Sequence, residues 1–274
     1  MLGQHCNRKH KMSIHLDTKE KIDKKADFLD EIRISLIERI HHLFSFFGIR
    51  QEEIPLFLKN FKISLKDVLH ERDLLEKFNE NVISYISNKF LINEKWIYRK
   101  ADEMIPIRSR EFYKNSGCFC EKIYKSNPNH IFILSERKPN KKIDEERDDN
   151  RFAIIIEYVV SKIGKEDILA YAIYDDAECR YGYWRCRYEL KRFLLGFKKK
   201  TFIPSAYGYS IPNIAKQLRE FSKGKKRWPD VIKNKTIWYP EDYIDFPSEN
   251  MNAVKEELDE LKRVVEEYNN ISNY

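Results

Sequence analysis

The stretch Phe-Ala-Ile-Ile-Ile-Glu-Tyr-Val-Val at residues 152–160 decides the architecture of the second half of the chain. This nearly continuous apolar run ends in β-branched residues, which is typical of a buried strand. A second strand is expected at Ile168–Tyr174, after a turn at Gly164, and a short one at His130–Leu134 upstream. Strands grouped in this way, with helices around them, predict an α+β domain, whose sheet we expect to be antiparallel.

Downstream of these strands, residues 180–195 alternate aromatic and basic side chains, and their first half fits a strand with one basic face. Lys198-Lys199-Lys200 precedes a further short strand near Phe202–Ile203. Ile211–Phe221 has the apolar spacing of a helix.

Basic residues interleaved with aromatic ones favour single-stranded nucleic acid, because Lys and Arg neutralise phosphates while aromatic faces stack on bases. The same basic and aromatic residues would suit RNA or a small anionic ligand equally well. The candidate anion site consists of Arg180, Tyr183, Trp184, Arg185, Arg187, Lys198, Lys199, Lys200, Lys225 and Arg227. The alternative interpretation is a half-buried strand whose aromatic residues lie in the core and whose cations lie in solvent.

Upstream of the strands, residues 27–106 have the i, i+3, i+4, i+7 apolar spacing of helices. We expect five helices, at Asp27–Phe47, at Gln51–Leu58, through Leu65–Leu69, at Leu74–Phe90 and around Trp96 and Ile97. Gly48 can end the first helix and Asn93 can cap the fifth. Short helices on tight loops predict a compact all-α unit.

The second and third expected helices carry a recognisable pattern. Gln51-Glu52-Glu53-Ile54, followed by Leu58, Leu65 and Val68, resembles the paired helices of the phage-repressor (Cro/lambda-repressor-like) helix-turn-helix family. The stretch Ile83–Ile97 is similar to that family's closing helix, whose Trp-Leu signature here reads Trp96-Ile97. The likeness covers about residues 30–104. It implies that the second helix rests across the DNA backbone while the third enters the major groove.

Several positions bear on how such a motif would read DNA. Pro55 stands where the family usually has Ala, and Lys59 or Asn60 replaces the turn Gly, whose left-handed conformation Asn can adopt. The resemblance implies that the following residues face the DNA: Gln51, Lys62, Ser64, Lys66, Asp67 and His70. Lys can donate to guanine or phosphate, Asp can accept from cytosine, and Ser is permissive. The alternative interpretation is a small helical bundle with a solvated polar face.

Charge is distributed unevenly along the 274 residues, which carry 51 Lys and Arg against 44 Asp and Glu, a formal net charge of +7. Residues 1–106 and 107–150 each carry +2, residues 151–247 carry +7, and residues 248–274 carry −4. An anionic partner is therefore expected, although most of the excess positive charge lies in the α+β segment.

Composition excludes several classes of protein. A hydrophobic content of 42% is too high for a disordered chain, and five cysteines do not make a disulfide scaffold, which favours reduced thiols and a cytoplasmic location. No apolar run approaches the roughly 18 residues of a membrane span, and the basic, polar start lacks a secretory signal pattern. We therefore expect no membrane partner.

Metal binding and catalysis have weak signals in this sequence. Cys118, Cys120, Cys179 and Cys186 could supply four thiolates to one zinc ion, but structural zinc sites favour other spacings, and ordinary half-buried thiols are the alternative. Asp175, Asp176 and Glu178 could hold a divalent cation, whereas paired Asp residues are typical of a turn. No nucleophile elbow, zinc-protease, P-loop or dinucleotide-binding motif occurs, so we expect neither an enzyme nor a cofactor.

The predicted organisation has four segments. Residues 1–26 form a basic, disordered start, 27–106 a helix-turn-helix-like domain, 107–247 an α+β domain with a charged loop at 137–150, and 248–274 a C-terminal helix. In that helix, apolar residues recur at heptad spacing from Met251 to Tyr268, which favours a short coiled coil and a homodimer. Packing of the same stripe on its own domain is the alternative. Together these features predict a dimeric, double-stranded DNA-binding regulator of phage-repressor type with a C-terminal effector domain. The alternative is a protein that binds RNA or single-stranded nucleic acid.

Overall fold

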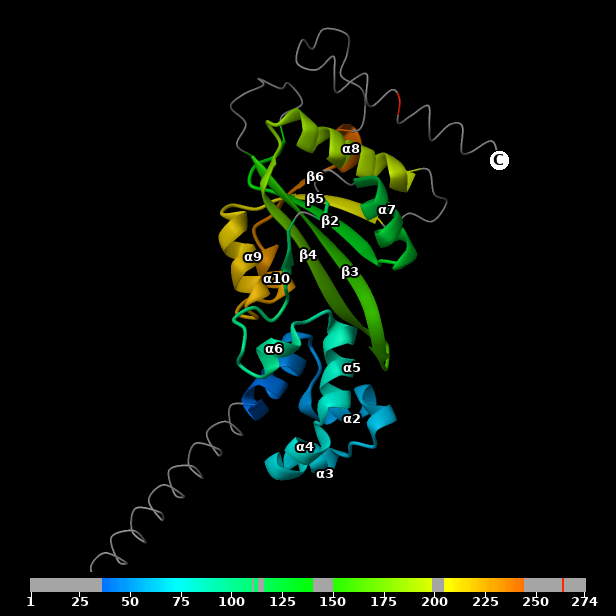
Figure 1. Cartoon of the computed structure of the whole chain (residues 1–274), viewed down its shortest axis with the longest axis vertical. Helices are drawn as coiled ribbons and strands as arrows, with labels where there is room; N and C mark the ends of the chain where they lie inside the picture. Colours follow the sequence, from blue (N-terminus) through cyan, green and yellow to red (C-terminus); the bar gives the residue numbers. More distant parts are fainter. Residues whose placement is uncertain are drawn as a thin grey trace, which may run out of the picture.

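The computed structural model describes residues 36–109, 111–112, 116–139, 150–198, 205–243 and 263 (Figure 1). The predictions for the N-terminal segment 1–26, for most of the loop 137–150, for Lys199 and Lys200, for the strand near Phe202–Ile203 and for the C-terminal helix fall outside these residues, apart from Arg263.

A six-stranded sheet organises the second half of the chain, in the order β1-β4-β3-β2-β5-β6. The strands are β1 (Ile107–Arg108), β2 (His130–Ser135), β3 (Arg151–Ile163), β4 (Glu166–Arg180), β5 (Ser205–Ser210) and β6 (Thr236–Trp238). The strands expected at His130–Leu134, Phe152–Val160 and Ile168–Tyr174 are thus confirmed, and the last two extend further than expected. β3 and β4 form a long antiparallel hairpin through a turn in which Gly164 has a φ of +61°.

The expectation of an antiparallel sheet was wrong, because the sheet is mixed. β1 pairs with β4 and β2 pairs with β5 in parallel, while the other three pairings are antiparallel. Parallel neighbours are joined by crossover connections rather than by hairpins. The partners here lie far apart in the sequence, so the pattern of each strand alone cannot reveal its direction.

Helices cover both faces of the sheet (Figure 1). On one face, α7 (Ser116–Lys125) and α8 (Trp184–Lys198) pack over a hydrophobic cluster that includes Phe152, Ile154 and Ile156 of β3. On the other face, α9 (Ile214–Ser222) and α10 (Trp228–Val231) pack over Ala153 and Ile155. Alternate residues of β3 are therefore buried on opposite faces, which accounts for its continuous apolar run.

Residues 180–195 do not form the expected strand. β4 ends at Arg180, a turn follows, and α8 begins at Trp184. The buried side chains of α8 include Cys186, Leu190, Phe193 and Leu194, which follow helical spacing. Aromatic and basic residues alternate around Arg180–Tyr188, as they would in a strand. The buried positions of this segment, however, recur with the period of a helix.

Short helices make up the part of the chain before the sheet. A first helix is described over residues 36–46. It is followed by the 3-10 helix η1 (Gln51–Glu53), α2 (Ile54–Phe57), the 3-10 helix η2 (Lys59–Phe61), α3 (Leu65–Leu69), α4 (Glu71–Lys77), α5 (Glu80–Phe90) and α6 (Glu94–Ile97). A last 3-10 helix, η3 (Pro240–Tyr243), follows β6.

Two helix boundaries differ from those expected. Leu74–Phe90 is not one helix, because the chain breaks after Lys77 and Asn79 caps α5 by accepting hydrogen bonds from the amides of Asn81 and Val82. The helical pattern of Ser109–Lys125 is interrupted at Asn115-Ser116-Gly117, and in the structure α7 covers Ser116–Lys125, while Ile107–Arg108 forms the short edge strand β1.

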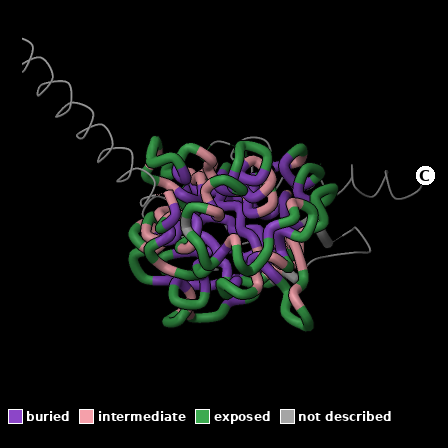
Figure 2. The backbone as a smooth tube through the Cα atoms, turned by 90° about the horizontal axis from the view of Figure 1, so that it is seen from below, coloured by how far each residue is buried: buried purple, intermediate pink, exposed green. Residues whose placement is uncertain are grey.

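The helical part and the sheet share one hydrophobic cluster. It runs from Phe44 and Phe90 in the helical part to Ile173 of β4 and Phe221 of α9. The backbone amides of Met104 and Ile105 both donate to the carbonyl of Ser222, which ties the end of the helical part to α9. Figure 2 shows the result, since buried backbone fills the centre of the molecule and exposed residues surround it.

Candidate nucleic-acid interface

Within the predicted reading segment, residues 51–70, α3 lies at the end of the helical part that is farther from the sheet, whereas α2 contacts β3 (Figure 1). Ile54, Leu58 and Val68 are buried and hold α2 and α3 together. The structure leaves most of the predicted groove-facing residues exposed, namely Gln51, Lys62, Ser64, Lys66 and His70, while Asp67 is half-buried. The Gln51 side-chain amide donates to the backbone oxygen of Val68 at 3.4 Å, which links the start of η1 to α3.

The left-handed residue of the turn between α2 and α3 is Lys62, with a φ of 55°. We expected this conformation at Lys59 or Asn60, which instead belong to η2. Because η2 adds a 3-10 turn after α2, the chain reverses direction closer to α3, at residue 62. The left-handed conformation is therefore adopted by a lysine, for which it is energetically unfavourable. Lys62 therefore stands at the start of α3 with its side chain in solvent.

Ser64 and Asp67 form a reciprocal cap at the start of α3. The Ser64 hydroxyl accepts a hydrogen bond from the Asp67 amide at 3.2 Å, and Asp67 Oδ2 accepts from the Ser64 amide and hydroxyl at 2.7 Å each. These bonds from the Ser64 amide and hydroxyl lower the pKa of Asp67. The pattern Ser-x-x-Asp before an apolar run is a capping-box signature that the sequence could have revealed. Both side chains thus have a structural role. Of the predicted contact residues in and beside α3, this leaves Lys62 before the helix, Lys66 within it and His70 directly after it as solvent-facing groups.

The exposed surface of the helical part around α2 and α3 also carries leucines. Leu65 and Leu69 of α3 are 44% and 59% exposed, and Leu56 of α2 is 61% exposed. Val68 is the residue of α3 that enters the core, so Leu65 and Leu69 fall on the solvent side, one helical turn apart. Apolar side chains at such positions can contact the methyl group of thymine in a major groove.

A groove of about 520 Å³, which we call the junction groove, lies between this helical part and Arg227 before α10. It is lined by His41, Phe44, Ser45, Gly48, Ile49, Arg50, Gln51, Ile54 and Arg227. Of these residues, Gln51 and Arg227 are the ones that the sequence predicted to bind a ligand, and it assigned them to different sites. The groove is lined by segments that are far apart in the chain, so no local sequence pattern predicts it.

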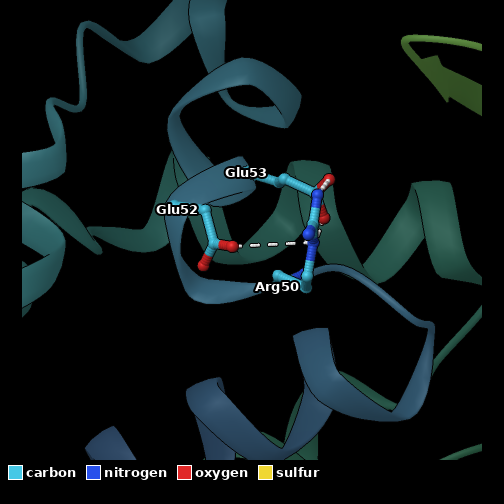
Figure 3. Close-up of polar contacts among 3 residues, drawn as sticks. All are labelled: Arg50, Glu52 and Glu53. Atoms are coloured by element: carbon cyan, nitrogen blue, oxygen red, sulfur yellow. Dashed lines mark hydrogen bonds and ion pairs between the residues drawn. The ribbon is translucent and has the colours of Figure 1, made fainter.

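Arg50 stands at the edge of the junction groove, between two glutamates that follow it (Figure 3). Its Nη2 lies 2.6 Å from Glu53 Oε1 and its Nε lies 3.6 Å from Glu52 Oε1. The backbone amide of Arg50 also donates to Glu53 Oε2 at 2.9 Å. The Arg50 side chain and amide lower the pKa of Glu53, and Glu53 raises the pKa of Arg50. These bonds fix the chain at the point where η1 begins.

Those residues of the predicted basic-aromatic anion site that the structure describes are not all brought together. Arg180, Tyr183 and Arg185 are exposed near the start of α8, whereas Lys225 and Arg227 lie between α9 and α10, on the other face of the sheet. Arg187 is 1% exposed, and its Nη1 donates to the carbonyls of Tyr181 and Gly182 at 2.7 and 2.8 Å. It therefore closes the turn before α8. The side chains of Trp184 and Lys198 and all of Lys199 and Lys200 fall outside the described part of the structure.

The four cysteines of the predicted zinc site have different environments. Cys118 is exposed, whereas Cys120, Cys179 and Cys186 are buried in the cluster under α7 and α8. Cys120 Sγ and Cys186 Sγ donate to the carbonyls of Phe193 and Glu178 at 3.8 and 3.6 Å. A hydrogen bond with Cys186, together with burial, raises the pKa of the Cys179 thiol. Within the described residues, no group of three or more His, Cys, Asp or Glu side chains is arranged to hold a metal ion.

The carboxylates of Asp175 and Asp176 lie in β4 rather than in the turn we expected. Asp175 is buried and forms two hydrogen bonds with the Arg151 guanidinium, at 2.9 Å to Nε and 2.6 Å to Nη2. Burial raises the pKa of Asp175, against the opposing effect of Arg151. Asp176 Oδ1 accepts a hydrogen bond from the Glu178 amide at 3.0 Å. Asp175 is thus held by Arg151, whereas Asp176 Oδ2 is buried without a hydrogen-bond partner among the described residues.

No protein-family model, curated protein or solved structure matches the chain. Among the described residues, no helix is both long and apolar enough to cross a membrane.

Proposed function

We propose that the chain is a sequence-specific, double-stranded DNA-binding transcriptional regulator of phage-repressor type. The observation that carries this proposal is the solvent-facing surface of α3 and the turn before it, where Lys62, Lys66 and His70 flank two exposed leucines. In a helix-turn-helix protein this is the element that enters the major groove. Cations would bind phosphates or guanine there, and leucines would contact thymine methyl groups.

Rigid support of α3 agrees with a reading role, because a side chain can discriminate between bases only if its helix is held in register. The Ser64–Asp67 cap fixes the first turn, Val68 anchors the opposite side in the core, and Gln51 binds the carbonyl of Val68. The short length of α3, five residues, limits direct base contacts to one helical turn and a half.

The sheet and its helices would then serve as the effector or assembly half, and the C-terminal helix would join two chains. A homodimer would present two copies of α3 to two half-sites. Removal of residues 249–274 should halve the mass measured by light scattering. An unchanged mass would exclude dimerisation through this helix.

The runner-up function is binding of RNA or single-stranded nucleic acid through the sheet domain. Exposed Tyr183 beside Arg180 and Arg185 supports it, since an aromatic face between cations can stack on a base. Arg187 and Phe193 point into the core, however, so the alternating pattern that favoured this function largely serves the packing of α8.

Fluorescence anisotropy of the full chain on random duplex and single-stranded probes, at two salt concentrations, separates these functions. We expect the full chain to bind the duplex probe. Lys66→Gln should weaken this binding and should lower the number of counterions released, measured as the slope of log affinity against log salt concentration, by about one. Lys125→Gln, at the exposed end of α7, is the matched control and should leave binding unchanged. Binding only to single strands would favour the runner-up, and binding to neither probe would exclude both functions.

A further inference from the structure

We propose that the junction groove binds a small organic phosphate of about the size of a mononucleotide. The groove opens between the turn after the first helix and the start of α10, and among the residues assigned to DNA it is lined by Gln51. Its occupation does not depend on the proposed function, because ligand binding to the full chain can be measured without DNA.

Two parts of the chain build the groove. Residues 41–54 form one wall, and Arg227 reaches it from the other part of the fold. Gly48 has a φ of +79°, and the position that a Cβ would take there lies 3.3 Å from Arg227 Nη2. Because residue 48 has no side chain, the Arg227 guanidinium can lie directly against the turn, at the mouth of the groove.

The charges of the lining residues favour an anion. Arg50, Arg227 and His41 line the groove, together with the Ser45 hydroxyl and the Gln51 amide, and none of the described lining residues is a carboxylate. Arg227 is exposed, and its guanidinium forms no hydrogen bond or ion pair with another of the described residues, although its backbone carbonyl accepts from the amides of Asp230 and Val231. Arg50 uses Nη2 and Nε for Glu53 and Glu52, which leaves its Nη1 available to a ligand. Guanidinium groups match the geometry of phosphate oxygens.

The size and floor of the groove indicate more than an inorganic ion. A volume of about 520 Å³ lies within the roughly 300–1,000 Å³ of small-molecule sites. The floor is formed by the buried side chains of Phe44, Ile49 and Ile54, which suit an apolar portion of a ligand. The combination of a cationic rim and an apolar floor fits a phosphate attached to an organic body.

A ligand in this place would contact Arg227 and the start of η1 at once. It would therefore stabilise the folded arrangement of the helical part against α10 in proportion to its concentration. The start of η1 is linked to α3 by the hydrogen bond from Gln51 to the carbonyl of Val68. Any effect of the ligand on duplex affinity would be matched by an equal effect of duplex on ligand affinity.

Isothermal titration calorimetry of the full chain with adenosine 5′-monophosphate, adenosine and inorganic phosphate tests the proposal. We expect the monophosphate to bind at least tenfold more tightly than either adenosine or inorganic phosphate. If adenosine bound as tightly as the monophosphate, the cationic side chains would not contribute to binding. If inorganic phosphate bound as tightly as the monophosphate, the apolar residues of the groove would not contribute. Either result, or no binding of any probe, would overturn the proposal.

Two variants locate the site. Arg227→Gln should weaken binding of the monophosphate at least tenfold, while Lys233→Gln, which removes an equal charge from an exposed residue beyond α10 and outside the groove, should change it less than twofold. Equal losses in both variants would indicate nonspecific attraction and would overturn the assignment to this groove. Ser45→Trp, at an exposed lining position, should block binding by filling the space, with unchanged circular dichroism as evidence of folding. Unimpaired binding by that variant would also count against the groove.

Discussion

At residue 62 the backbone adopts the left-handed conformation with a lysine rather than a glycine. Such a conformation costs an L-residue about 1 kcal/mol, and glycine avoids that cost. Lys62→Gly should therefore raise the free energy of unfolding by up to about 1 kcal/mol in urea denaturation, less the extra entropy of glycine in the unfolded chain. The same change should weaken duplex binding, because a cation beside α3 is lost.

Lys62→Ala is the matched control for this prediction. It removes the same charge but keeps the unfavourable conformation, so it should weaken duplex binding equally without the gain in stability. Equal stability of the two variants would show that residue 62 is not strained in solution.

Asp67 gives the cap of α3 a defined pH dependence. Its folded-state pKa is lowered by the hydrogen bonds from Ser64, so its contribution to stability is present above the unfolded pKa of about 3.8 and is lost as the pH falls through the folded value. Melting temperatures of the wild type should therefore exceed those of Asp67→Asn near neutral pH, and the two should converge in acid. Ser64→Ala keeps the carboxylate but removes the hydroxyl, and should give a smaller acid dependence. A constant difference at all pH values would contradict this role for the carboxylate.

At the scale of single elements, the apolar residues of α3 divide between the core, where Val68 is buried, and solvent, to which Leu65 and Leu69 are exposed. Val68→Ala should cost about 2 kcal/mol of stability, since Val68 is buried and its methyl groups leave a cavity. Leu65→Ala and Leu69→Ala should cost less than about 0.5 kcal/mol, because both side chains are largely exposed. Chemical denaturation measures these differences.

Duplex binding should show the opposite order among these three variants. The leucine variants should weaken binding to a selected site that contains thymine, and replacement of thymine by uracil, which removes the methyl group, should have little further effect on them. A variant of Val68 that remains folded should keep wild-type affinity. Leucine variants that bind as well as the wild type would exclude a reading role for this face.

The strands and α8 show how far the sequence predicts such elements. β3 was predictable because Phe152, Ile154 and Ile156 face one cluster while Ala153 and Ile155 face the other, so every position is apolar. α8 was not, because its aromatic and basic residues alternate at its start, as they would in a half-buried strand. The junction groove was beyond prediction, since Arg227 meets Gly48 only through the packing of α9 and α10 on the sheet.

At the scale of the whole molecule, the helical part and the sheet are joined through α9. Phe221 is fully buried, and its ring lies 5.8 Å from that of Phe46 in the first helix and 5.5 Å from that of Tyr171 in β4. The boundary near residue 106 predicted from sequence therefore separates two kinds of secondary structure but crosses one continuous core. A shared core of this kind couples the unfolding of the parts that it joins.

Phe221→Ala tests this coupling. The change should cost about 4 kcal/mol, because it removes a buried aromatic ring from the centre of the cluster. Hydrogen exchange followed by mass spectrometry should then accelerate to the same degree in peptides from α5 and from β3, since both would open in one cooperative event. The control Tyr239→Ala, at a largely exposed position after β6, should leave both peptides unchanged. Acceleration confined to the sheet would mean that the helical part unfolds on its own. A ligand in the junction groove would then have to act on two independent units, whereas in a single cooperative unit it protects both peptides together.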